Sequence, residues 1–169
     1  MDENLRAALF ALDMAMQTER DGRAFYLRAA ESTQNEQGRA LFALIADEEL
    51  GHLAMLEARR KALADQGRWL PFDEQPQDAM PKTPIFAKRL GDGELNAHTS
   101  DLSALRVAYL IEKDAVDFYS RAADQTEDAE GRKMYLFLVA MEQTHQDALE
   151  TEYKLLSEQF KSMMGFSPF

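Results

Sequence analysis

The chain has 169 residues, a formal net charge of −11 at pH 7 and no cysteine. At about 150 residues per domain, this length predicts one domain. The acidic balance argues against nucleic acid or an anionic membrane as a partner, because clustered cations hold such partners. The lack of cysteine excludes disulfides, zinc–thiolate sites, iron–sulfur clusters and thiol nucleophiles. An acidic N-terminus and the lack of a long apolar run predict a cytoplasmic protein without a membrane span.

Four segments carry apolar residues at the spacing of a helix face. In chain order we predict helices over residues 4–33, 36–65, 101–126 and 129–160, the third with Ser100 as its N-cap. Short polar connections join the first segment to the second and the third to the fourth, so each pair should form an antiparallel hairpin. The sequence therefore predicts an all-α protein, a four-helix bundle with one long connection.

The long connection is the segment 67–99. Four of the five prolines lie there, at positions 71, 76, 81 and 84. Each removes a backbone N–H and clashes with the preceding helical turn, so the segment should be an irregular crossover, with room for a short helical turn over residues 84–90. A tail, residues 161–169, follows the last helix, because Gly165 and Pro168 disfavour its continuation.

The chain repeats itself at a constant offset of 93 residues. Matching pairs are Glu19 and Glu112, Tyr26 and Tyr119, Gly38 and Gly131, Glu49 and Glu142, and His52 and His145. Because the register never slips, we interpret the chain as one duplicated hairpin. The duplication predicts a pseudo-two-fold axis inside the bundle, on which a functional site can lie.

Six ionisable residues lie within the apolar stripes, where a core should exclude them: Glu19, Glu49, His52, Glu112, Glu142 and His145. A buried carboxylate without a partner costs several kcal/mol, and four converging carboxylates repel one another. Two divalent cations would neutralise the four negative charges. The alternative is a metal-free polar network, but nothing cationic in the stripes could balance the acids. Each Glu-x-x-His spacing also places both side chains on one helix face.

One glutamate on each of two helices, with Glu-x-x-His on each of the other two, resembles the rubrerythrin branch of the ferritin-like superfamily. The resemblance covers the bundle without the crossover and the tail. It implies a ferritin-like fold with two iron ions, for which manganese or zinc are alternatives. It implies bridging carboxylates at Glu49 and Glu142, outer carboxylates at Glu19 and Glu112, and imidazole ligands at His52 and His145.

Tyr26 and Tyr119 follow Glu19 and Glu112 by seven residues and share their helix face. They resemble tyrosines that hydrogen-bond ligand carboxylates in this family, so they are the candidate catalytic residues beside the metal ligands. The alternative is ordinary core packing.

The resemblance implies a peroxidase that reduces hydrogen peroxide at a non-haem di-iron site. A chain without cysteine has no rubredoxin domain, so electrons must come from an external donor such as a rubredoxin-like protein. Rubrerythrins also carry an extra glutamate where this chain has Ala115, with Gly22 as its repeat mate. The remaining ligands equally resemble the ferroxidase centre of a bacterioferritin, and a non-catalytic metal-binding scaffold is a third alternative. Relatives assemble as dimers or larger oligomers, so we expect a homo-oligomer that the apolar tail helps to hold. The alternative is that the tail folds back over the end of its own bundle.

Overall fold

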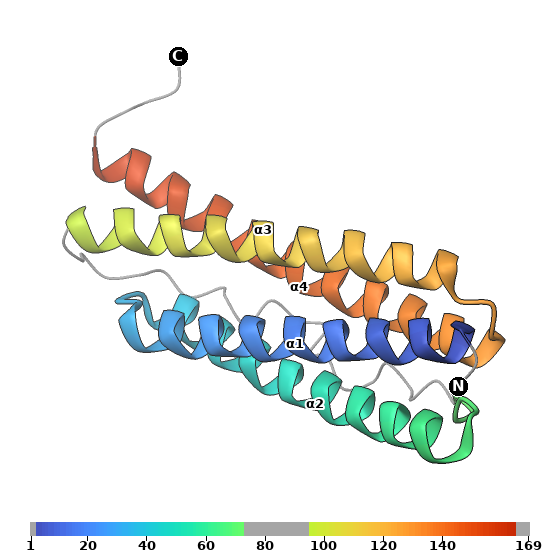
Figure 1. Cartoon of the computed structure of the whole chain (residues 1–169). Coiled ribbons are helices and arrows are strands. Elements are labelled where there is room, and N and C mark those ends of the chain that lie inside the picture. Colours follow the sequence, from blue (N-terminus) through green and yellow to red (C-terminus); the bar gives the residue numbers. More distant parts are fainter. Residues whose placement is uncertain (1–2, 73–94, 165–169) are drawn as a thin grey trace.

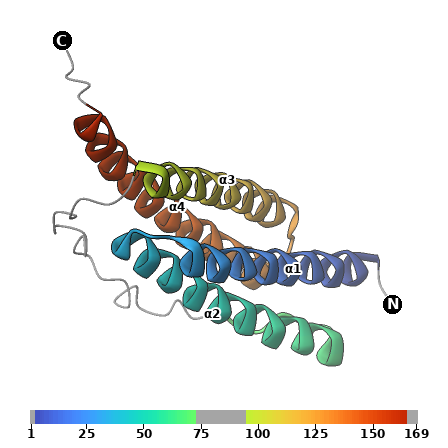
Figure 2. The ribbon, with the colours of Figure 1, turned by 90° about the vertical axis from the view of Figure 1, so that its left-hand side faces the viewer.

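The computed structural model describes residues 3–72 and 95–164, and in this part of the chain it contains four helices (Figure 1). These are α1 (Glu3–Ser32), α2 (Glu36–Gln66), α3 (Leu95–Gln125) and α4 (Ala129–Met163). Helices α1 and α2 pack as one hairpin and α3 and α4 as the other, and the two hairpins lie side by side (Figures 1 and 2). The predicted fold class, an all-α four-helix bundle of two hairpins, is confirmed.

The second helix of each hairpin begins in the same way. Asn35 caps α2 by accepting a hydrogen bond from the Gly38 amide, and Asp128 caps α4 by accepting from the Glu130 and Gly131 amides. Asn35 and Asp128 lie 93 residues apart, so the repeat includes the caps. Gly67 caps the C-terminal end of α2, and its φ of 66° is the left-handed conformation that glycine adopts without a steric cost.

The predicted N-cap of the third helix is wrong, because α3 begins at Leu95 and Ser100 lies within it. The physical reason is a tertiary contact of the neighbouring acid. The buried Asp101 carboxylate accepts hydrogen bonds from the Gln34 and Asn35 amides, at 3.2 Å and 2.9 Å, in the turn between α1 and α2. The Asp101 carboxylate therefore joins α3 to the α1–α2 hairpin.

Two expectations lie wholly or partly outside the described residues. The predicted helical turn over 84–90 is not among them, and neither are residues 165–169 of the predicted tail. Helix α4 continues to Met163, three residues into that tail. Met163 and Met164 are both exposed, so the described beginning of the tail does not pack onto its own bundle.

Two apolar clusters fill the bundle, one towards each end. One contains Leu12, Leu56, Tyr119, Tyr135 and Leu138, and the other contains Tyr26, Phe42, Ile45, Leu105 and Leu149, all at most 1% exposed. Burial of such side chains contributes roughly 1.5–3 kcal/mol each. Along every helix the six ionisable residues fall between members of the two clusters. The core is therefore interrupted in its middle by a polar layer.

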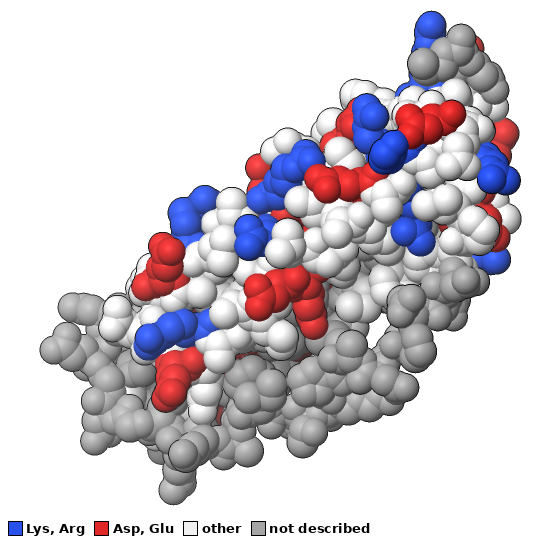
Figure 3. Space-filling view, turned by 90° about the horizontal axis from the view of Figure 1, so that it is seen from below, with Lys and Arg blue, Asp and Glu red and all other residues white. Residues whose placement is uncertain are grey.

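The surface carries charges of both signs. Among the described residues on the face in Figure 3, basic side chains alternate with acidic ones over the length of the bundle. None of the helices in the described ranges is long and apolar enough to cross a membrane. The expectation that the protein does not bind nucleic acid stays a prediction.

Candidate metal centre

All four helices contribute to the polar layer in the middle of the bundle. Glu19 lies on α1, Glu49 and His52 on α2, Glu112 on α3, and Glu142 and His145 on α4. Each of the six residues is at most 5% exposed. The structure thus brings together every metal ligand that the sequence predicts, from positions up to 126 residues apart.

The six residues form two overlapping groups of four. Glu19, Glu49, His52 and Glu142 each offer a donor atom within 4.8 Å of the others, and so do Glu49, Glu112, Glu142 and His145. Glu49 and Glu142 belong to both groups. The two groups thus share two carboxylates and otherwise have separate donors. This arrangement suits a pair of adjacent cations.

In the first group, three buried atoms face one another without a well-aligned hydrogen bond. His52 Nδ1 lies 3.3 Å from Glu19 Oε2 and 3.2 Å from Glu142 Oε1, and none of these atoms has a hydrogen-bond partner in the described part of the chain. Buried polar atoms left unpaired cost about 1–3 kcal/mol each. A divalent cation among them would satisfy all three at once, so the donor set fits a metal.

In the second group, His145 has a hydrogen-bond partner on each side of its ring. Its Nδ1 lies 3.0 Å from Glu142 Oε2 and 3.6 Å from Glu112 Oε1, whereas its Nε2 lies 2.6 Å from Glu48 Oε2. If Nδ1 serves as the ligand atom, Nε2 carries the proton and donates it to Glu48. Such a carboxylate fixes both the tautomer and the orientation of a ligand imidazole.

The sequence analysis missed Glu48, and the repeat explains why. Its mate 93 residues later is Met141, so Glu48 does not belong to the duplicated pattern. The only available signal was an extra acid directly before Glu49. Its contact with His145 depends on the antiparallel pairing of α2 with α4 across the bundle, and the sequence does not show that pairing.

The two tyrosines connect opposite hairpins. The Tyr26 hydroxyl on α1 donates to Glu112 on α3, and the Tyr119 hydroxyl on α3 donates to Glu19 on α1. Burial, together with the negative charge of the bonded glutamate, raises the pKa of both tyrosines well above the ordinary value. Both hydroxyls therefore keep their protons and hold the outer carboxylates from across the bundle.

Burial and mutual contact shift the pKa values of the glutamates in different directions. Burial, with contributions from neighbouring glutamates, raises the pKa of Glu49 to about 10. Burial likewise raises the pKa of Glu112 to about 7, against the contact with His145. Burial also opposes ionisation of Glu142, but its contacts with His145 and His52 outweigh burial and lower its pKa.

The pKa values of both histidines are raised. Burial alone would lower them, but the surrounding carboxylates outweigh burial and hold the pKa of His52 and of His145 well above the ordinary range. Without a cation the cluster therefore binds protons in its place. No lysine or arginine in the described ranges forms an ion pair with any of the four glutamates.

The position of the missing extra glutamate faces the cluster. A Cβ atom at Gly22 would lie 3.9 Å from Glu49 Oε1, and the repeat mate Ala115 is buried. A longer side chain at position 22 would therefore start in contact with Glu49. The chain has none there, so the donor set keeps its internal symmetry.

Comparison with known proteins gives the family. The family model described as Rubrerythrin matches residues 11–153, which include all six cluster residues and both tyrosines. No curated protein matches the chain.

Two solved structures share the fold at low sequence identity. A hypothetical protein from Pyrococcus furiosus is 24% identical with a TM-score of 0.67, covering 90% of this chain and 91% of its own. A bacterioferritin from Rhodobacter capsulatus, described with a metal-free dinuclear site and haem iron, is 18% identical with a TM-score of 0.50, covering 97% and 96%. With the family model matched over most of its length and a ferritin-like bundle as its fold, the chain belongs to the rubrerythrin family.

Proposed function

We propose that this protein holds two iron ions in the buried cluster and reduces hydrogen peroxide with electrons from an external donor. The observation that carries the proposal is the pair of overlapping four-residue groups that share Glu49 and Glu142. Oxygen-rich donors with one imidazole for each ion suit Fe²⁺ or Mn²⁺, although zinc also binds such sites. Two iron ions held there would supply the two electrons needed to break the O–O bond of peroxide.

The protein side chains hold and orient this centre. Glu49 and Glu142 would bridge the ions, and Glu19 and Glu112 would each hold one from outside. Tyr26 and Tyr119 stay protonated and fix the outer carboxylates. Because the layer is closed by apolar clusters on both sides, its charges are shielded from water and interact strongly with each other.

The electrons for repeated turnover must come from another protein. An iron–tetrathiolate domain needs cysteine, and this chain has none. We therefore propose a separate one-electron carrier of the rubredoxin type as the donor.

The test begins with anaerobic loading of the metal-free protein with Fe²⁺, followed by stopped-flow mixing with hydrogen peroxide or with dioxygen. We expect oxidation of the iron by peroxide to be much faster than by dioxygen. After re-reduction by an added one-electron donor, the iron should again be oxidised rapidly by peroxide. Zinc-loaded protein is the control for unspecific peroxide consumption. Bound iron that neither oxidant oxidises would favour a metal-binding scaffold and contradict the proposal.

A ferroxidase is the second candidate, and one observation favours it. Position 115, where rubrerythrins carry the extra glutamate, is alanine, and its mate is Gly22, whose missing Cβ would touch Glu49. The symmetric donor set that remains suits a centre that oxidises Fe²⁺ and releases Fe³⁺. Loss of iron from the centre after each oxidation, with dioxygen as effective as peroxide, would support this candidate over the peroxidase.

A further inference from the structure

A stack of three aromatic rings leads from the cluster towards one end of the bundle. The Tyr119 hydroxyl donates to Glu19, and the Tyr119 ring stacks on Tyr135 with centroids 6.2 Å apart and planes at 24°. Tyr135 in turn meets Trp69 edge-on, with centroids 6.1 Å apart and planes at 74°. Both separations lie in the range of direct aromatic contact. Trp69 is the only tryptophan in the chain.

The α1–α2 hairpin has an equivalent pair of stacked rings, but in the described residues its series of rings stops there. Tyr26 stacks on Phe42 with centroids 6.2 Å apart and planes at 26°, almost the geometry of Tyr119 on Tyr135. Phe42 is the repeat mate of Tyr135. In the described residues Phe42 contacts no second ring beyond Tyr26, whereas Tyr135 contacts Trp69. The two halves therefore share a packing arrangement, but in this part of the chain the series of rings reaches a tryptophan in one half only.

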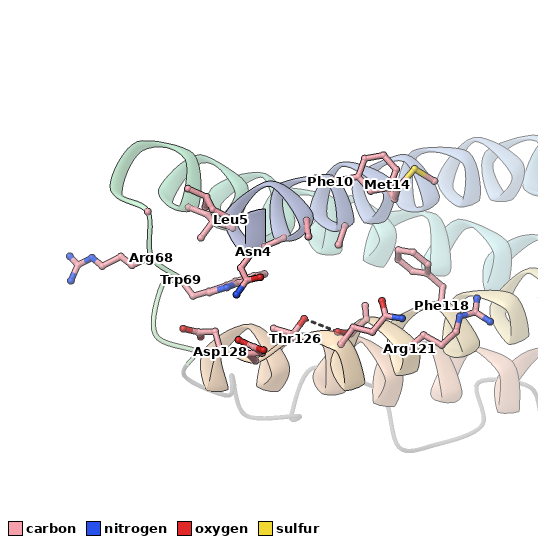
Figure 4. A pocket seen from close by; sticks show the side chains of 18 residues that line it. Asn4, Leu5, Phe10, Met14, Arg68, Trp69, Phe118, Arg121, Thr126 and Asp128 are labelled. Atoms are coloured by element: carbon pink, nitrogen blue, oxygen red, sulfur yellow. Dashed lines mark hydrogen bonds between the residues drawn. The ribbon is translucent and has the colours of Figure 1, made fainter. Parts of the chain in front are cut away.

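The outer end of the series reaches the surface. Trp69 is partly exposed and lines a groove of about 780 Å³ between α1 and the end of α3. Figure 4 shows its side chain turned into this groove, while the side chain of Arg68 points away from it. A soluble electron carrier can approach Trp69 here, whereas Tyr135 and Tyr119 are fully buried.

The two tyrosine hydroxyls differ in their partners. The Tyr119 hydroxyl donates to Glu19, so a hydrogen bond joins the Tyr119 ring to a candidate metal ligand. The Tyr135 hydroxyl has no hydrogen-bond partner in the described residues, and burial raises its pKa well above the ordinary value. A tyrosine that cannot release its proton is costly to oxidise, so the Tyr135 ring serves as a bridge between its two neighbours.

We propose that Trp69, Tyr135 and Tyr119 form a one-electron path between the surface groove and the metal centre. This proposal rests on the proposed peroxidase function. Hydrogen peroxide takes up two electrons and two protons to give two water molecules. The electrons come one at a time from an external one-electron carrier, each entering at Trp69 and crossing the Tyr135 and Tyr119 rings.

The test exploits what the path should do when no carrier is present. Protein loaded with a single Fe²⁺ per chain is mixed with hydrogen peroxide in the presence of dioxygen and without a reductant. Hydrogen peroxide needs two electrons and the iron gives only one, so Trp69 supplies the second, loses its indole proton, and the resulting radical takes up dioxygen. We expect a transient tryptophan radical by electron paramagnetic resonance and oxygen adducts on the Trp69 peptide by mass spectrometry.

A matched pair of variants isolates the path. Tyr135→Leu removes the bridging ring, and Phe42→Leu makes the equivalent change in the other half. Tyr135→Leu should lower the yield of Trp69 adducts, per iron oxidised, to that of zinc-loaded protein, while Phe42→Leu should keep the wild-type yield. Tyr135→Phe keeps the ring and should also keep the yield, which makes the test valid even if the leucine variants fold poorly.

The outcomes separate this proposal from the one on which it rests. If peroxide does not oxidise iron in the wild type, the peroxidase function itself is contradicted. If iron is oxidised but Trp69 stays unmodified and no tryptophan radical forms, the electron path is overturned. Equal Trp69 yields in Tyr135→Leu and the wild type would also overturn it, and loss of yield in Tyr135→Phe would overturn the bridging role.

Discussion

The two hairpins carry the same acids and histidines, yet their surroundings differ. In the α1–α2 hairpin Tyr26 stacks on Phe42, whereas in the α3–α4 hairpin Tyr119 stacks on Tyr135, which contacts Trp69. We expect charge to fix the cluster residues, because each carboxylate would balance the same two proposed cations. Phe42 and Tyr135 only have to fill the same volume, so the duplicated halves could diverge there without disturbing the bundle.

The histidines show the same divergence. His145 hydrogen-bonds Glu48 from the opposite hairpin, whereas the residue at the repeat position of Glu48 is Met141. A thioether cannot accept a proton from imidazole as a carboxylate does. The difference teaches that a duplicated sequence can produce two unequal halves of one centre, and the following changes test how unequal they are.

The largest effect should come from the two shared glutamates. Glu49→Ala and Glu142→Ala each remove a side chain that belongs to both four-residue groups, so we expect loss of nearly all bound iron. Glu19→Ala and Glu112→Ala each affect one group and should leave about one ion of the expected two. Elemental analysis after reconstitution measures the content.

Glu152→Gln is the control for these substitutions. Glu152 is a buried glutamate on α4 outside the cluster, and burial raises its pKa. The Glu152→Gln variant should retain the full iron content. Equal iron loss in all four alanine variants would contradict the division into shared and outer carboxylates.

The next effect is a dependence of stability on pH in the metal-free protein. Burial raises the pKa of Glu112 to about 7 and that of Glu49 to about 10, from 4.5, so the folded state holds protons that the unfolded state releases. Stability should therefore be greatest near pH 4.5, and it should fall as pH rises through 7 and towards 10. The raised pKa values of His52 and His145 act in the same direction above pH 6.5.

Thermal melts measure this dependence. The melting temperature of the metal-free protein should be several degrees lower at pH 8 than at pH 5. Iron should reverse the trend, because the ligands must lose their protons before they bind metal. A metal ion at one hundred times its dissociation constant adds about 2.7 kcal/mol to the free energy of unfolding. A metal-free melting temperature that rises from pH 5 to pH 8 would contradict these pKa directions.

A smaller effect should distinguish the two histidines. Glu48→Gln replaces the carboxylate that accepts from His145 Nε2 with a neutral amide. Loss of such a partner typically lowers metal affinity roughly 10–100-fold. Because Glu48 contacts only one histidine, we expect a titration with Fe²⁺ to show one weakened ion and one unchanged ion. Met141→Leu, at the repeat position, should leave both affinities as they are.

The glycines near the two turns should respond differently to alanine. A Cβ at Gly131 would lie 2.7 Å from the Trp69 ring, so Gly131→Ala must displace that ring and should cost about 1–3 kcal/mol. A Cβ at Gly38 would lie 3.2 Å from the Thr33 methyl, a contact that a small shift relieves. Gly38→Ala should be near neutral, since alanine favours the helix by about 0.5–1 kcal/mol. Chemical denaturation compares the two variants.

The smallest change concerns the end of α4, which has no counterpart in the first hairpin. Helix α2 ends at Gln66, whereas α4 runs past the equivalent position to Met163. We predict that this extension and the residues after it help to hold a homo-oligomer. Truncation after Phe160 should lower the mass measured by light scattering without changing the iron content. Unchanged mass would contradict the prediction.

The sequence by itself determined the fold class and the candidate cluster. Helical periodicity identified four long segments, and ionisable residues in apolar stripes are so costly to bury that they pointed to a metal. The constant offset between the two halves also placed Glu19, Glu112 and their tyrosines at equivalent positions. These properties depend on local spacing and on charge, and both can be read along the chain.

Only the tertiary structure decided which residues meet across the hairpins. The α3 start at Leu95, the Asp101 bond to the α1–α2 turn and the Glu48 contact with His145 all depend on how the hairpins pack. The same holds for Trp69, whose place beside Tyr135 follows from the chain turning at Gly67 after α2. Such contacts join residues that no periodicity relates, because they arise from the relative position of two rigid hairpins.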